Sequence, residues 1–546
     1  MGIVLQIKKI AIFALSTISL LLVIVDRLSM ALVSQWREDQ ATNLYIGYHF
    51  FDWSTPVGLI SSTGIPNPNG MVLLGALLSR LPGLLAVSTA LGLLLVAVLG
   101  LWIISVSQQD NKMAIVTGLP LFSSYILRVN GSEFWNQLIY TEINVVLLVL
   151  LAGFYRSKKS IYLTISVILL FYMPSFYLAG LTNTCAFFTI FLFFLLITIR
   201  RGDYIYKSKS DMILNFGVMS MGLISSCVLV WFPYFNTVSL HQLHGLKSMP
   251  LYGRILESFK ALCFTPVWLY DLASFTRPVF YREDTTILGP VTSAIEYAIS
   301  LSIKFQIVVL VCLFVAIYLN KRYILAKNWF YFIPLYFIIL NYMACPLLNG
   351  PLWHAGERPD MTYQFYAILL LFLFTTSYSL ARDYGRKAIA VCMVNAILFS
   401  CLNIGAGFFF LHDTLCYRGS YLTDCDVPLI HKCQALHYIV EQWHQHHGGS
   451  TIPIDYTVFG LWPWVPAAGA QLNRYYPSVY TTGRSFDYEL ERLYGVRNSQ
   501  EGVQDRTIGS GQYVISYAHD QSVLTSFTTI KSVYFGRIKV SELINN

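Results

Sequence analysis

Residues 10–41 read IAIFALSTISLLLVIVDRLSMALVSQWREDQA, an apolar run that leads directly into the acidic pair Glu38-Asp39. The run 10–33 is long enough to cross a bilayer as a helix, because about 20 apolar residues span the hydrocarbon core. Lys8 and Lys9 precede it, as in a signal peptide, but the run is long and lacks a small-residue cleavage site. We therefore expect a retained first span with its N-terminus in the cytoplasm and the acidic pair on the opposite, outer side.

The rest of the chain is as apolar as this beginning. Of its 546 residues, 55% are hydrophobic and 12% charged, and the mean hydropathy is +0.55. Soluble domains average about a quarter charged residues, so the composition excludes a soluble enzyme and a disordered scaffold. We expect a polytopic α-helical membrane protein with about eleven transmembrane helices, interfacial helices and a C-terminal α/β extracytoplasmic domain. The predicted spans are 10–33, 81–106, 113–127, 138–155, 160–180, 183–199, 212–232, 298–319, 328–345, 362–380 and 388–411.

The loops between these spans separate by charge. Lysine and arginine gather in short loops with few acids, as in cytoplasmic loops. The opposite side carries the long segments 34–80, 233–297, 346–361 and 412–546, and all eleven histidines. The net charge of +8 therefore reflects membrane orientation, and the expected partner is the lipid bilayer, not nucleic acid. We expect an integral protein of a bacterial inner membrane with a periplasmic or extracellular C-terminus.

Two domains follow from this topology. Residues 1–411 form the transmembrane domain with outer loops 34–80 and 233–297, and residues 412–546 form the α/β domain, with a helix at 434–446 and a strand at 513–517. The outer loops should hold surface helices over 40–51, 71–80 and 251–274. The outer cysteines permit one disulfide, with its pairing left open, among Cys416, Cys425 and Cys433.

The acids beside the predicted spans are the candidate chemical groups. Asp39 precedes a surface helix, so it is either the N-cap of that helix or a general base for an acceptor hydroxyl. Glu133, in Arg128-Val-Asn-Gly-Ser-Glu, is either a helix-start acid or faces Asp39 across a cleft. Glu142 is the one internal charge that we expect within a span, which makes it a functional candidate.

A third candidate segment runs from His354 through Arg358 to Tyr363, directly before a span. Arg358 either anchors the helix at the interface or pairs with a lipid phosphate, which a guanidinium binds in a two-pronged fashion. Phosphate-binding loops and the metalloprotease and serine-hydrolase motifs are missing from the sequence. The cluster His444, His446 and His447 lacks the spacing of a zinc site, so no cofactor is expected and a divalent metal has no support.

Taken together, this layout resembles the GT-C superfamily of integral-membrane glycosyltransferases, above all its protein O-mannosyltransferase and aminoarabinose-transferase branches. The matching motif is Glu38-Asp39-Gln40-Ala41 at the start of the first outer loop, where the family has an acidic pair and an interfacial helix. The stretch Gly64-Ile-Pro-Asn-Pro-Asn-Gly70 is similar to the Asn-Pro-Pro stretch of the family. Gln40 stands where many relatives carry Glu, which leaves Asp39 as the aligned base.

The resemblance implies an enzyme that transfers a sugar, a hexose or a pentose, from a polyprenyl phosphate to an acceptor hydroxyl, with inversion. The acceptor would be a lipid, a glycan or a protein. The implied catalytic residues are Asp39, Glu38 and Glu133, the implied donor-phosphate ligands are Arg358, Arg128 and Arg37, and the implied substrate-binding residues are Tyr45, Asn67, Asn69, His354 and Tyr363.

Two other classes of membrane protein stay open from the sequence. A polymerase or ligase of lipid-linked glycans would place its catalytic groups in loop 233–297, at Arg254, Arg277 and His241. A transporter or flippase would carry ionisable groups at mid-membrane, whereas nearly all charges here lie at the ends of predicted spans.

Overall fold

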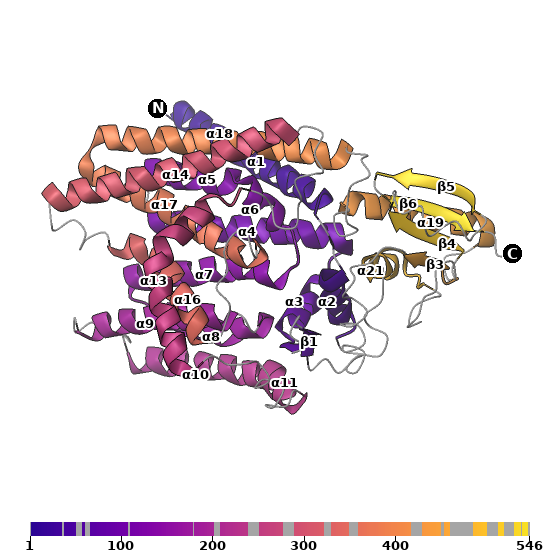
Figure 1. Ribbon diagram of the computed structural model, residues 1–546, viewed down its shortest axis with the longest axis horizontal. Coiled ribbons are helices and arrows are strands. Elements are labelled where there is room, and N and C mark those ends of the chain that lie inside the picture. Colours follow the sequence, from indigo (N-terminus) through magenta and orange to yellow (C-terminus); the bar gives the residue numbers. More distant parts are fainter. Residues whose placement is uncertain are drawn as a thin grey trace.

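The fold is a bundle of long helices with a small α/β domain at one end (Figure 1). The computed structural model describes residues 2–34, 36, 38–50, 57–60, 66–107, 110–177, 180–200, 208–237, 250–276, 289–320, 329–348, 359–416, 428–448, 452–458, 484–498, 512–517, 529–536 and 538–543. Within these ranges, eight helices are long and apolar enough to cross a membrane. The architecture is therefore that of a polytopic helical membrane protein, as the composition predicts.

The helices of the bundle follow the predicted spans, apart from the helix at 251–273, which the sequence predicts as a surface helix. Those before the middle of the chain are α1 (Gly2–Leu32), α4 (Gly83–Ser107), α5 (Asn111–Ser123), α6 (Tyr125–Asn130), α7 (Asn136–Ser157), α8 (Ser160–Phe176), α9 (Leu181–Arg200) and α10 (Lys209–Ser226). The π-helical turn η2 (Cys227–Trp231) continues α10 into α11 (Phe232–Thr237). The later ones are α13 (Leu251–Ala273), α14 (Gly289–Asn320), the 3-10 turn η4 (Trp329–Phe332), α16 (Ile333–Leu347), α17 (Pro359–Tyr384) and α18 (Arg386–Cys416).

One predicted span is wrong as a single helix. The range 113–127 is divided between α5 and α6 at Ser124, whose ψ of 111° is not helical. Pro120 lies in the last turn of α5, and the Ser124 side chain accepts a hydrogen bond from the Leu127 N–H at 3.5 Å. A serine in this conformation ends one helix and caps the next, which the apolar pattern alone does not reveal.

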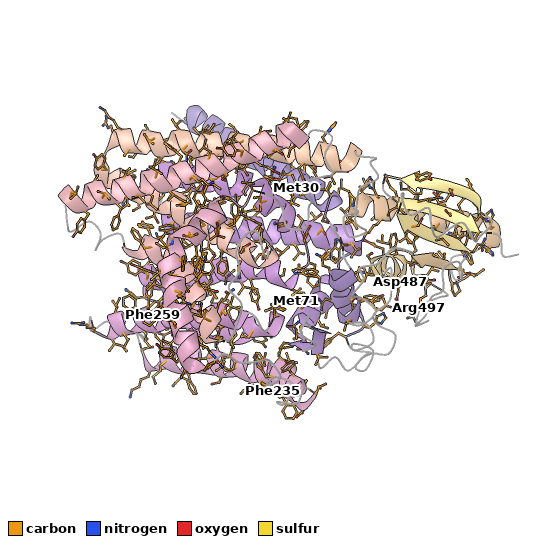
Figure 2. All side chains as sticks on the ribbon, viewed as in Figure 1. Met30, Met71, Phe235, Phe259, Asp487 and Arg497 are labelled. Carbon is orange, nitrogen blue, oxygen red and sulfur yellow. The ribbon has the colours of Figure 1, made fainter. Side chains whose placement is uncertain are left out.

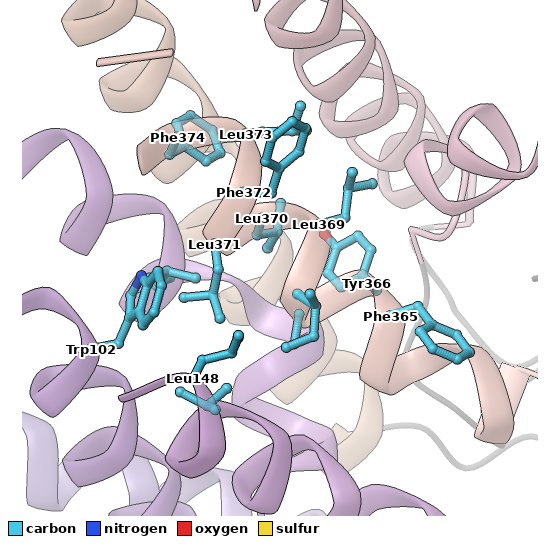
Figure 3. Packing of buried hydrophobic residues seen from close by; sticks show 14 of the residues in the cluster. Trp102, Leu148, Phe365, Tyr366, Leu369, Leu370, Leu371, Phe372, Leu373 and Phe374 are labelled. Carbon is cyan, nitrogen blue, oxygen red and sulfur yellow. The ribbon is translucent and has the colours of Figure 1, made fainter. Parts of the chain in front are cut away.

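Helix α17 forms the centre of the bundle. Its entire membrane-length window is buried inside the protein, unlike that of any other candidate span in the described ranges. Figure 3 shows Leu371 of α17 on the side that faces Trp102 of α4 and Leu148 of α7, whereas Phe365 lies on another side of the helix. At the periphery, Phe235 and Phe259 are exposed, whereas Met30 and Met71 are buried (Figure 2). A helix enclosed by protein rather than lipid can carry polar side chains at membrane depth.

The first loop forms α2 (Glu38–Tyr48) and α3 (Gly70–Leu78), with a small antiparallel pair β1 (Val57–Ile60) and β2 (Pro66–Pro68) between them. The two helices cross in close contact, because a Cβ on Gly47 would lie 2.4 Å from the Ala76 backbone N. Helix α2 is predicted to lie along a membrane surface, but its residues 40–47 are buried. Its surface is covered by α3 and by the C-terminal region.

The C-terminal region 412–546, called the tail below, carries a mixed sheet in the order β3-β4-β6-β5. Strand β3 (Tyr456–Val458) is parallel to β4 (Tyr513–Tyr517), and β6 (Ile538–Leu543) is antiparallel to β4 and β5 (Thr529–Phe535). Helix α19 (Leu429–His447) packs on the sheet through an apolar face that includes Leu436 and Trp443. The predicted helix and strand of the tail are confirmed. The short α21 (Arg484–Glu489) lies beside α2 (Figure 1) and leads into the π-helical turn η5 (Leu490–Tyr494).

Candidate functional site

The stretch between α1 and α2 is fixed by contacts with α4. The Trp36 indole N–H donates to Ser88 Oγ at 2.8 Å, and the Ser34 and Ser88 hydroxyls lie 3.1 Å apart. The Trp36 ring also stacks on Phe134, with ring centroids 6.1 Å apart. The chain that leads into the acidic pair is therefore held against the bundle.

The tail holds the same stretch from the other side. The Leu429 N–H donates to the Ser34 carbonyl at 3.0 Å, and Lys432 Nζ donates to the Trp36 carbonyl. Lys432 is buried and its Nζ lies 3.4 Å from Ser485 Oγ of α21. These bonds define one end of the bundle as the tail-side end.

The acidic pair begins α2 at this tail-side end. Glu38 and Asp39 are its first two residues, so Asp39 belongs to the first turn and is not the residue before the helix. Carboxylates in a first turn are favoured by the helix dipole. The side chains of Glu38 and Asp39 lie outside the description, as do Arg37, His354 and Arg358 entirely, so their predicted roles stay predictions.

We call one set of ionisable side chains within the bundle the charged cluster. The Arg128 guanidinium of α6 contacts Asp26 Oδ1 of α1 at 2.6 Å, and Arg27 Nη2 lies 3.4 Å from Asp26 Oδ2. Asp26 and Arg27 lie about 8 Å before the end of α1, at 1.5 Å per residue. The cluster comprises Asp26, Arg27, Arg128, Glu133, Glu142 and Tyr363.

Tyr363 links the two halves of this cluster. Its hydroxyl is fully buried near the start of α17, and Glu142, Arg27 and Glu133 all act on it electrostatically. Glu133 is 1% exposed and Glu142 is 5% exposed, so both carboxyl groups are inside the protein. The structure thus brings together Arg128, Glu133 and Tyr363, which the sequence singles out separately.

Sequence reasoning missed Asp26 and Arg27. We expected Glu142 to be the one charge within a span, and this is wrong, because α1 carries an Asp-Arg pair between Val25 and Leu28. The signal was present as two adjacent charges inside an apolar run. Their proximity to the end of the run made them resemble interfacial residues, although Arg27 is 3% exposed.

Two glycines make room for the arginines of the cluster. A Cβ on Gly407 of α18 would lie 1.8 Å from Arg128 Nη2, and one on Gly92 of α4 would lie 3.1 Å from Arg27 Cδ. Arg128 Nη2 lies 3.5 Å from the Asn403 carbonyl of α18. Because glycine has no side chain, the backbones of α4 and α18 can lie close to the side chains of these two arginines.

The remaining predicted substrate-binding residues lie elsewhere. The Tyr45 hydroxyl donates to Glu491 Oε2 of the tail at 3.3 Å, which places it in the contact between α2 and η5. The Asn69 amide donates to the Leu229 carbonyl at 3.1 Å, and Asn67 is buried in β2. The contacts of Tyr45 and Asn69 thus join α2 to the tail and the start of α3 to η2.

Two further carboxyl groups of the tail contact the first loop and the start of α4. Glu491 lies 3.5 Å from His49 Nε2 and 3.2 Å from Arg497, and Glu489 accepts a hydrogen bond from the Leu84 N–H. Burial raises the pKa of Glu489 to about 7 against the lowering effect of that hydrogen bond. Partial burial acts to raise the pKa of Glu491, but His49, Arg497 and Tyr45 outweigh it, so this pKa lies below its ordinary value.

The histidines near the end of α19 make separate contacts. His447 stacks on Trp443 with centroids 4.0 Å apart, and His446 Nδ1 lies 3.8 Å from Glu542. In the described part of the chain, no three His, Cys, Asp or Glu side chains are arranged to hold a metal ion. Cys433 is a free thiol there, and Cys416 and Cys425 lie where the structure describes no side chains.

Fold and cluster together define a polytopic helical membrane protein with a buried ionisable site near the tail-side end of its bundle. No protein-family model matches the sequence, and no curated protein matches it. Two solved structures are similar in fold. The crystal structure of ArnT from Cupriavidus metallidurans in the apo state has a TM-score of 0.48 and 10% identity, with 98% of both chains covered. ArnT from the same organism bound to undecaprenyl phosphate has a TM-score of 0.44 and 11% identity, with 97% of this chain and 98% of that chain covered. At these values the comparison assigns neither a substrate nor site residues.

Proposed function

We propose that this chain is a GT-C-type membrane glycosyltransferase that moves a sugar from a polyprenyl phosphate to an acceptor hydroxyl. The observation that carries the proposal is the charged cluster, whose side chains other than Asp26 are buried, at the end of the bundle where α2 begins with Glu38 and Asp39. Ionisable groups at membrane depth are costly and are retained for function. A lipid-linked substrate brings its own charge to that depth.

The proposed reaction uses Asp39 as the general base. Asp39 takes the proton of the acceptor hydroxyl, whose oxygen attacks the anomeric carbon of the sugar. The bond from that carbon to the phosphate oxygen breaks, and its electron pair leaves with the polyprenyl phosphate. Arginines stabilise the charge that develops there, with Arg358, Arg128 and Arg37 as the candidates from the sequence. Glu38 and Glu133 orient the acceptor or a basic partner.

The proposed orientation follows from the charge of the loops. The N-terminus is cytoplasmic and the tail is periplasmic or extracellular, so transfer takes place at the outer surface of a bacterial inner membrane. In this arrangement the tail contacts the first loop through Lys432 and Glu491 and the start of α4 through Glu489. A lipid, a glycan or a protein would serve as the acceptor.

The experiment that tests the proposal is turnover of radiolabelled polyprenyl-phosphate sugars in membranes that contain the native protein or Asp39→Asn. Asparagine keeps the size of the side chain and removes the base, so sugar transfer and release should collapse. Asp110→Asn is the matched control, because Asp110 caps α5 at the opposite end of α4 and asparagine caps equally well. Equal turnover by the native and Asp39→Asn proteins would reject Asp39 as the base.

A second candidate, a transporter or flippase of lipid-linked compounds, gains support from the charges inside the bundle. Asp26, Arg27 and Glu142 lie within membrane-length helices, where transporters carry their ion and substrate sites. The two functions differ in chemistry. A transferase breaks the sugar–phosphate bond, whereas a transporter moves the intact donor across proteoliposomes.

A polymerase or ligase of lipid-linked glycans is the third candidate. Of its expected groups, Arg254 lies on α13, and Arg277 and His241 lie outside the described residues. Loss of activity in variants of these three residues, with Asp39→Asn fully active, is the result that would favour it.

A further inference from the structure

The Arg27 guanidinium is buried with few partners. Its side chain is 4% exposed, and its contact with Asp26 is through Nη2 at 3.4 Å. Its Nε and Nη1 atoms have no hydrogen-bond partner among the described residues. A buried cation with two unsatisfied donors is costly, so these atoms call for a ligand that the described residues do not supply.

Asp26 lies between two arginines. One of its carboxylate oxygens contacts Arg128 at 2.6 Å and the other faces Arg27. One carboxylate faces two guanidinium groups here, so this part of the cluster is formally positive, whereas the other two carboxyl groups of the cluster, Glu133 and Glu142, belong to its other part. This part of the charged cluster is suited to an anion, and two guanidinium groups favour the several oxygens of a phosphate.

The other part of the cluster has the opposite character. The Tyr363 hydroxyl and Glu142 Oε2 are buried, and neither has a hydrogen-bond partner in the described ranges. Tyr363 interacts electrostatically with two acids, Glu142 and Glu133, and with one base, Arg27. Carboxylate and phenol groups bind hydroxyl groups, so the cluster changes from anion-binding to hydroxyl-binding across Tyr363.

The cluster also borders an exposed apolar face of α1. Asp26 is 28% exposed, and Leu22 and Val25 beside it are 64% and 59% exposed. Residues four apart share a helix face, so Leu22 lies directly below Asp26. An apolar chain can therefore lie along α1 in the bilayer while its polar head group enters the cluster.

We propose that the charged cluster binds the donor in one orientation, with its phosphate on Arg27 and Arg128 and its sugar hydroxyls on Glu142 and Tyr363. The polyprenyl chain then lies against α1. Arg27 is thereby a phosphate-binding residue in the first span, and Asp26 holds both guanidinium groups in place. The proposal rests on the proposed function for the nature of the sugar donor. Its phosphate half concerns binding alone and needs no turnover.

The test measures binding of undecaprenyl phosphate to the purified full chain in nanodiscs, by native mass spectrometry. Arg27→Gln should weaken this binding by at least about tenfold, the loss expected for hydrogen bonds to a charged group. Arg27→Lys should restore part of the affinity, because lysine keeps the charge and loses the fork. Arg156→Gln is the matched control, since Arg156 ends α7 at the opposite end and donates to the Val106 carbonyl.

Two further probes separate the sources of the phosphate. Undecaprenol, which lacks the phosphate, should bind weakly to the native protein and equally to Arg27→Gln. Phosphatidylglycerol should compete poorly. If it displaces undecaprenyl phosphate at equal concentration, the cluster is a general site for lipid head groups and the proposal is overturned. Unchanged undecaprenyl-phosphate affinity in Arg27→Gln overturns it as well.

Glu142→Gln tests the orientation and does not depend on the stability of Arg27→Gln. Removing this carboxylate should leave the affinity for undecaprenyl phosphate unchanged or raise it, and should lower the affinity for an undecaprenyl-phosphate sugar. Equal loss for both ligands would contradict the orientation. These measurements concern binding alone, so their outcome is independent of the turnover test with Asp39→Asn. Donor binding by the cluster can be supported when the role of Asp39 is rejected, and it can be rejected when the role of Asp39 is supported.

Discussion

The structure predicts that Glu489→Gln strengthens the docking of the tail on the bundle by an amount that depends on pH. Glu489 is buried where α21 meets the turn before α4, and one carboxylate oxygen accepts the Leu84 N–H. A Cβ on Gly83 would lie 2.7 Å from the other oxygen, so the carboxyl group is tightly enclosed. Glutamine keeps an acceptor for Leu84 and removes the titrating group.

The magnitude follows from the pKa of Glu489. In the docked tail it is raised by burial to about 7, from an ordinary value of 4.5. The docked state therefore binds the proton more tightly, and docking is strongest below pH 4.5 and weakens as the pH rises through 7. At pH 8 this difference between the two pKa values weakens the docking of the tail by about 3 kcal/mol, at 1.36 kcal/mol per pH unit. Glutamine should restore up to that amount of docking free energy at pH 8 and should leave the docking free energy unchanged near pH 4.5.

Other titrating groups near Glu489 do not reproduce this effect. Burial raises the pKa of Cys433 to about 12 and holds the pKa of Tyr488 above its ordinary value, so neither changes charge between pH 5 and 8. His49, which faces Glu491, is present in both proteins, so its contribution cancels in the comparison.

Amide hydrogen exchange over residues 484–494 is the assay, because it reports local opening of the docked tail. At pH 8, protection in Glu489→Gln should exceed that in the native protein by up to about two orders of magnitude, which is about 3 kcal/mol. Glu441→Gln, on the exposed face of α19, should show no such gain. Equal or lower protection in Glu489→Gln at pH 8 would refute the reasoning.

Three further substitutions test close contacts. Gly407→Ala would put a Cβ 1.8 Å from Arg128 Nη2 and break the pair between Arg128 and Asp26. Melting measurements should therefore show a free energy of unfolding that is lower by about 3–5 kcal/mol, and donor turnover should be lost. Gly47→Ala pushes α2 away from α3, and should cost about 1–3 kcal/mol in the same melting measurement. Lys432→Met leaves the Trp36 carbonyl without its donor and should cost about 1–3 kcal/mol, with Lys432→Arg recovering part of the loss.

The helical bundle was predictable because apolar runs of membrane length determine it. The range 362–380, for example, falls inside α17, and 81–106 differs from α4 by a residue or two. The break at Ser124 was not predictable in the same way, because both α5 and α6 are apolar and the division depends on one backbone angle. The burial of α2 likewise depends on a partner, the tail, that is hundreds of residues away in sequence.

The candidate site was predictable in part. Arg128, Glu133 and Tyr363 are visible as polar residues beside spans, but their meeting with Asp26 and Arg27 requires α1, α6 and α17 to be placed in space. Hydropathy averages over a window, and an Asp-Arg pair near the end of a strongly apolar run barely changes that average. The pair becomes informative when its burial is known.

The contacts that hold the tail have a thermodynamic consequence for ligands inside the bundle. Lys432 bonds the stretch that leads from α1 to α2, and Glu489 bonds the turn that begins α4. Any compound whose binding shifts these elements alters the docking free energy, and by linkage docking alters the affinity for that compound by the same factor. A molecule that binds the tail outside the membrane can therefore change the affinity of the bundle for a ligand inside the membrane.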